Sequence, residues 1–158
     1  MKKNKIAALA AALFIAGTAE VYSLGLGVQF GGGLFGTNAA LLISPSDDMH
    51  FAISWNFYKD GGYLGLSGDY WVWEPKLTKV GSGALNFFIG PGFYVNLGFT
   101  DPMILDLGLR LPLGLDLKFK KFDLFLQAAP SIGIEFLPKF ALGGGGFFCG
   151  AIGARFWF

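Results

Sequence analysis

The sequence holds one histidine, His50, so any serine–histidine catalytic pair has to use this residue. Ser54 follows four residues later, and on a β-strand these two side chains share a face but lie about 13 Å apart. A nucleophile and its base must be within hydrogen-bond reach of each other. We therefore expect no catalytic residues and assign His50 to an interface or to the inside of the fold. A lipid-modifying enzyme that uses a more distant serine is the enzymatic alternative.

Metal and cofactor chemistry has little support in the sequence. Cys149 is the only cysteine, and no second thiol or further histidine is available to complete a metal site with it. We interpret Cys149 as a small filler residue near the last strand. The glycine run at 143–146 lacks the Lys-Ser/Thr of a phosphate-binding loop. We predict no cofactor and no metal.

Charged residues at alternating positions are the remaining candidates for chemistry. Charges inside a narrow fold must be paired or hydrated, so we expect an arginine–carboxylate network that plugs the interior. The alternative is a network whose pairs exchange and gate a small pore. The expected network consists of Asp69, Asp106, Arg110, Asp116, Asp123, Glu135 and Arg155.

The composition restricts the class of protein that must position these charges. Of the 158 residues, 53% are hydrophobic and only 15% are charged, with 18 Phe and 25 Gly. The apolar content excludes disorder, and 12 basic against 11 acidic residues exclude a positively charged nucleic-acid surface. A membrane protein or an unusually apolar exported barrel or sandwich remains.

The N-terminal segment is typical of a secretory signal. Lys2, Lys3 and Lys5 precede an apolar run of about a dozen residues, which is too short to span a bilayer as a helix. Cleavage is expected after Ala19 or after Ser23, and a retained anchor helix is the alternative. We divide the chain into a signal peptide, residues 1–23, and one folded domain, residues 24–158.

Turn signals divide the mature chain at seven places. Eight segments of about 8–15 residues lie between them, and a strand that crosses an outer membrane needs about 9–11 residues. The seven breaks are Gly31–Gly36, Ser44–Asp48, Lys59–Gly62, Glu74–Gly83, Gly98–Pro102, Lys118–Lys121 and Leu137–Gly146.

Within the segments, apolar residues occupy every second place. Between Leu105 and Phe119 each odd position is Leu or Phe, and the even positions are charged, glycine or proline. An eight-stranded barrel has room inside only for its inward side chains, so the Leu and Phe side chains must face outward into lipid. Pro91, Pro112 and Pro130 lie inside these segments, and we expect a β-bulge at some of them.

The last residues resemble the C-terminal assembly signal of outer-membrane barrels, with Gly153 followed by Phe156 and Phe158. The mature chain resembles the small OmpA-like barrels, in particular spirochaete outer-membrane proteins of unknown function. The pieces that carry this resemblance are the segments 27–31, 85–92, 109–115, 125–130 and 155–158. The resemblance implies a fold and a location but no activity.

The sequence therefore predicts an all-β protein, an eight-stranded antiparallel up-and-down transmembrane β-barrel in the cell outer membrane, preceded by a cleavable signal peptide. We expect a non-catalytic monomer with a filled lumen and short extracellular loops, and a narrow ion or solute channel is the alternative. Its expected partners are outer-membrane lipid, the barrel-assembly machinery and an envelope or host surface partner, with no nucleic acid.

Overall fold

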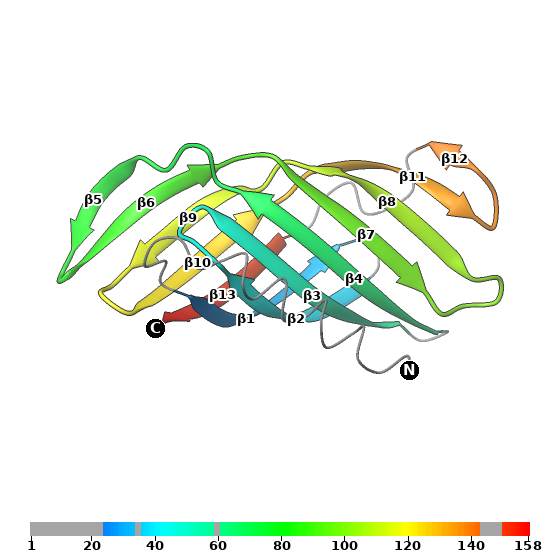
Figure 1. Cartoon of the computed structure of the whole chain (residues 1–158), viewed down its shortest axis with the longest axis horizontal. Coiled ribbons are helices and arrows are strands. Elements are labelled where there is room, and N and C mark those ends of the chain that lie inside the picture. The colour runs from blue at the N-terminus through cyan, green and yellow to red at the C-terminus, as the bar shows by residue number, and fades with distance from the viewer. Residues whose placement is uncertain (1–23, 34–35, 59–60, 143–149) are drawn as a thin grey trace, which may run out of the picture.

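The computed structural model describes residues 24–33, 36–58, 61–142 and 150–158, and these form strands and no helix (Figure 1). The expected signal peptide, residues 1–23, and Cys149 lie outside the described residues. The strands are β1 (Gly25–Gly33), β2 (Gly36–Ser44), β3 (Met49–Tyr58), β4 (Gly61–Tyr70), β5 (Lys76–Val80), β6 (Gly83–Ile89), β7 (Gly92–Gly98), β8 (Ile104–Arg110), β9 (Leu113–Lys118), β10 (Phe122–Ala128), β11 (Ser131–Leu137), β12 (Ala141–Leu142) and β13 (Gly150–Trp157).

All of these strands belong to one curled sheet. Its order is β12-β11-β8-β7-β4-β3-β2-β1-β13-β10-β9-β6-β5, and every pairing is antiparallel. In Figure 1 the β5–β6 hairpin and the β11–β12 hairpin project at opposite ends of the sheet. The expected all-β antiparallel fold is confirmed.

The expected number of eight strands is not confirmed, because the described residues hold thirteen. Three expected segments are each interrupted at a proline, which gives the pairs β6 and β7, β8 and β9, and β10 and β11. The expected break Glu74–Gly83 contains β5, and the expected break Leu137–Gly146 contains β12. Lysine, threonine and glycine suggested turns here, but pairing with β6 and β11 extends the strands.

The three prolines interrupt their strands, and among the described residues only one of these interruptions is accompanied by a bulge. Gly92 is opposite Arg110 and Ile89 is opposite Leu113, so both strands advance by three residues across the interruption. The pairing of β8 and β9 with β11 and β10 keeps its register in the same way. On the other side of Pro91, Asp69 is opposite Gly92 and Trp73 bridges to Ile89, so the neighbouring strand advances by four residues against three and carries a bulge. The expectation of a bulge at some of the prolines is therefore confirmed at Pro91, whereas the described pairings at Pro112 and Pro130 keep their register.

Hydrogen bonding explains why the ladder tolerates these prolines. A proline loses the bond that its missing N–H would donate, but its carbonyl oxygen still accepts one from the neighbouring strand. The bonds that remain run from Tyr70 N to Pro91 O at 2.9 Å, from Gly90 N to Pro112 O at 3.1 Å, and from Leu111 N to Pro130 O at 2.9 Å.

The two faces of the sheet have opposite chemistry. Large apolar side chains are exposed on the outer face, with Leu109 67% exposed and Ile132 68% exposed. On the inner face Arg155, Asp116 and Asp123 are among the most completely buried side chains of the described residues. Soluble proteins bury apolar side chains and seldom bury charged ones, so this sheet is inverted relative to a soluble fold.

Glycines on the inner face make room for rings. A Cβ atom at Gly133 would lie 2.1 Å from the hydroxyl oxygen of Tyr94, and one at Gly114 would lie 2.8 Å from Cζ of Phe88. Both distances are shorter than a van der Waals contact. The alternating glycines of the sequence therefore allow large side chains to fill the concave side of the sheet.

Candidate functional site

A buried arginine lies on the inner face, near the C-terminal end of β13. Arg155 on β13 is 2% exposed, and its Nε–H donates a hydrogen bond to Oδ1 of Asp123 at 3.0 Å. Asp123 lies directly opposite Arg155 in the register of β10 and β13. Oδ2 of Asp116 on β9 lies 3.7 Å from Nη2 of Arg155. One guanidinium therefore serves two fully buried carboxylates.

Aromatic rings enclose this guanidinium. Its central carbon lies 4.6 Å from the ring centroid of Trp71 and 5.0 Å from that of Phe125. Trp71 in turn stacks on Phe88 with 3.6 Å between centroids. The indole N–H of Trp157 donates to Oδ2 of Asp123 at 2.8 Å. Cation–π contacts and this further hydrogen bond compensate part of the cost of burying the charges.

A second cation extends the network beyond the predicted set. Nζ of Lys118 lies 2.8 Å from Oε1 of Glu74 and 3.8 Å from Oδ2 of Asp116. Asn86 donates to Glu74 at 2.9 Å. The alternation of the sequence puts Lys118 on the same face as Asp116. Glu74 could not be assigned from the sequence, because it falls in an expected turn.

His50 joins the same cluster instead of forming a catalytic pair with Ser54. Its Nδ1 is hydrogen-bonded to Oγ of Ser44 at 2.9 Å across the β2–β3 turn, and the same nitrogen contacts Nη1 of Arg155, which lies 3.2 Å from Nε2. Ser44 is completely buried. In serine hydrolases a carboxylate stabilises the imidazolium form of the catalytic histidine. Here the charged group beside the His50 ring is the guanidinium of Arg155. This geometry fits a buried structural hydrogen bond, and sequence analysis overlooked Ser44.

Arg110 and Asp69 form a separate pair. Nε of Arg110 on β8 lies 3.1 Å from Oδ1 of Asp69 on β4, and both side chains are less than a tenth exposed. Gly92 lies opposite Arg110, and a Cβ atom there would lie 2.2 Å from the same Asp69 oxygen. The glycine therefore leaves the space that this ion pair occupies.

The remaining two predicted carboxylates do not join an arginine. Asp106 on β8 accepts hydrogen bonds from the hydroxyl of Tyr94 at 3.2 Å and from the amide of Asn96 at 3.3 Å. Glu135 is opposite Asp106 in register. Among the described residues, no ion pair includes either of them. The seven predicted charges thus divide into the Arg155 cluster, the Arg110–Asp69 pair and the Asp106–Glu135 position.

The predicted assembly-signal residues alternate in orientation at the end of β13. Gly153 is buried against Phe125, whereas Phe156 and Phe158 are exposed with 5.1 Å between their ring centroids. Trp157, between the two phenylalanines, points inward and is buried. The last residues therefore present phenylalanine outward and anchor the strand inward.

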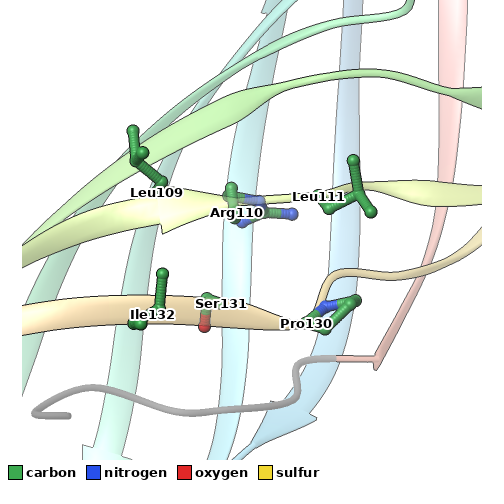
Figure 2. A pocket seen from close by; sticks show the side chains of 6 residues that line it. All are labelled: Leu109, Arg110, Leu111, Pro130, Ser131 and Ile132. Atoms are coloured by element: carbon green, nitrogen blue, oxygen red, sulfur yellow. The ribbon is translucent and has the colours of Figure 1, made fainter.

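A shallow outer pocket of about 370 Å³ lies where β8 pairs with β11 (Figure 2). Its aliphatic walls continue the apolar outer face and include few polar groups that could orient a ligand. It is lined by Leu109, Arg110, Leu111, Pro130, Ser131 and Ile132.

Comparison with known proteins finds no matching family model, curated protein or solved structure. Within the described part of the chain, no group of three or more His, Cys, Asp or Glu side chains could hold a metal ion. None of the described residues belongs to a helix long and apolar enough to cross a membrane.

Removing Arg155 tests the energetic role of the cluster. Arg155→Ala leaves Asp116 and Asp123 buried near each other without their shared cation, so we expect a loss of about 3–5 kcal/mol in the free energy of unfolding. Urea unfolding of the refolded protein in detergent micelles measures this loss. Adding Asp123→Asn should restore part of it. Lys139→Ala, at an exposed turn position, is the control and should change stability by less than about 0.5 kcal/mol. An unchanged midpoint for Arg155→Ala would contradict a stabilising network.

Proposed function

We propose that the chain is a non-catalytic integral outer-membrane β-barrel protein of eight transmembrane segments, with a side-chain-filled lumen and a structural or surface-interaction role. The observation that carries this proposal is the inverted sheet, in which aliphatic side chains cover the outside and ion pairs fill the inside. A surface of this kind is stable in hydrocarbon and is a liability in water.

Eight continuous segments follow if interrupted strands are combined. The pairs β6–β7, β8–β9 and β10–β11 keep their register across the prolines. β4 continues into β5, because Trp73 bridges to Ile89 and the N–H of Phe87 donates to the carbonyl of Pro75. β12 then counts as a short addition to β11. β1, β2, β3 and β13 complete the set.

The registers support closure of these segments into a barrel. One path of paired residues runs from Leu26 through Ile43, Phe51, Gly68, Phe93 and Leu109 to Ile132. On its other side, Leu26 pairs with Phe156 and Phe156 with Phe122. Phe122 and Ile132 are ten positions apart in one segment, so the circuit closes with a ten-residue stagger. For eight strands this stagger gives a tilt of ~40°.

The outer membrane is the location that these features favour. Closure removes exposed backbone edges, which hydrocarbon cannot hydrogen-bond. Export by residues 1–23 and recognition of Gly153, Phe156 and Phe158 by the assembly machinery are parts of the same proposal. If both termini face the periplasm, the β11–β12 hairpin faces outward, where Phe140 and Leu142 are highly exposed. We propose this hairpin as the contact for an envelope or host partner.

A narrow channel is the second candidate. Arg155 contacts two carboxylates at unequal distances, and Asp116 is also close to Lys118. Such pairs could exchange partners. Packing of Trp71 and Phe125 against the guanidinium, with Phe88 stacked on Trp71, favours the filled lumen.

The loss of stability caused by an arginine on the outer face distinguishes a membrane barrel from a soluble one. We expect Leu109→Arg to lower the free energy of unfolding in phospholipid vesicles by about 2–4 kcal/mol, because arginine in mid-membrane loses hydration. Leu77→Arg on the projecting β5 is the matched control and should have little effect. In a soluble barrel both exposed sites would tolerate arginine equally, and equal stability of the two variants would contradict membrane insertion.

Planar-bilayer recording tests the filled lumen. Protein that lacks residues 1–23, refolded and shown by an unboiled gel shift to be compact, should insert without discrete conductance steps. Reproducible steps of a single size would instead support the narrow channel and make Arg110 and Arg155 candidate gate residues.

A further inference from the structure

A second pocket lies at the end of the sheet that holds the C-terminal residues. It lies between the β2–β3 turn, the β9–β10 turn and the end of β13, and its volume is about 270 Å³. Pockets for drug-sized ligands are about 300–1,000 Å³, so this one suits a smaller group. It is lined by Asp47, Lys118, Phe119, Lys120, Lys121, Trp157 and Phe158.

The pocket has an excess of positive charge. Lys120 and Lys121 form the tip of a tight turn, which is closed by a hydrogen bond from the N–H of Phe119 to the carbonyl of Phe122 at 2.8 Å. Both lysines are exposed, and no ion pair between described residues includes either of them. Lys118 is already bound to Glu74, and Asp47 is the only acidic side chain of the lining. The two turn lysines are therefore available to an anion.

One wall of the same pocket is aromatic. Phe158 is 70% exposed and stacks edge to face on Phe156, while Phe119 and Trp157 complete the wall. Aromatic rings beside lysines are typical of the membrane–water interface, where rings contact acyl chains and ammonium groups reach the head groups. A free phosphate or an acidic peptide would use the lysines but would leave this wall without a partner.

We propose that this pocket binds the phosphate-bearing head group of an anionic phospholipid, with Lys120 and Lys121 on the phosphate and Phe119 and Phe158 beside the acyl chains. The proposal rests on the membrane function proposed above. It adds a specific lipid site at one rim of the barrel, on the side of the termini.

Native mass spectrometry of the folded protein, released from micelles doped with lipid, tests this site. With phosphatidylglycerol we expect one retained lipid at an occupancy about fivefold or more above that with phosphatidylcholine of the same acyl chains. The double variant Lys120→Glu/Lys121→Glu should lose this preference and weaken retention at least about tenfold, since each lysine near an anionic surface contributes about fivefold. Lys139→Glu, which changes an exposed lysine on the β11–β12 turn, is the control and should retain lipid like the unmodified protein.

Three results would overturn the proposal. They are equal retention of phosphatidylglycerol by the double variant, equal loss with Lys139→Glu, and retention of inorganic phosphate by the lipid-free protein at the same occupancy. Flotation with phosphatidylcholine vesicles checks the proposed function separately. Protein that floats but shows no head-group preference refutes only this site, whereas protein that does not float refutes the membrane function. Compact migration of unboiled samples shows that each variant has folded.

Discussion

The ion pair between Arg155 and Asp123 constrains the rest of the inner face. A guanidinium that is almost fully buried must keep its counter-charges close, because an uncompensated charge in a low-dielectric interior costs several kcal/mol. Asp116 and Asp123 supply two carboxylates, and Trp71 supplies a ring face. Gly27 has to be small, since a Cβ atom there would lie 2.8 Å from Cγ of Arg155. Neighbouring strands are thereby held in one register.

The outer face follows from the same constraint. Charged, aromatic and hydrogen-bonded side chains occupy the concave side, so the Leu, Ile and Phe side chains of the alternate positions have only the convex side available. Ile132 and Leu109 are paired in register and are both highly exposed. In the barrel that we propose, a lipid environment and a closed sheet would reconcile this surface with the hydrogen-bonding needs of the backbone. The β5–β6 and β11–β12 hairpins project at opposite ends of the sheet (Figure 1).

Much of this arrangement could be predicted from the period-2 alternation alone. The alternation between Leu105 and Phe119 assigned Asp106, Arg110 and Asp116 to one face, because successive side chains of a strand point to opposite sides. The prolines led us to expect bulges in the strands, and at Pro112 there is none. A sequence does not reveal that Pro112 can remain in an unbroken register by accepting a bond from Gly90.

Contacts between side chains of different strands were harder to predict than the face of the sheet on which each side chain lies. Alternation predicts which face of the sheet a side chain occupies but not which residues of neighbouring strands lie opposite it. The pairs Arg155–Asp123 and Arg110–Asp69 therefore became visible only from the strand registers of the structure. Ser44 and Glu74 fall in expected turns, and their roles depend on contacts with His50, six residues from Ser44, and with Lys118, far from Glu74 in the sequence. β5 was not predicted either, because its sequence contains residues typical of turns and its pairing with β6 cannot be read from the sequence.

The most direct test of the proposed membrane-spanning barrel is the orientation of its strands in a bilayer. Polarised infrared spectroscopy of the refolded protein in aligned phospholipid bilayers reports the mean strand tilt from the dichroism of the amide bands. Eight strands with a ten-residue stagger predict a tilt of ~40° from the bilayer normal. Protein that washes off the bilayers, or strands that show no preferred orientation, would contradict the closed transmembrane barrel.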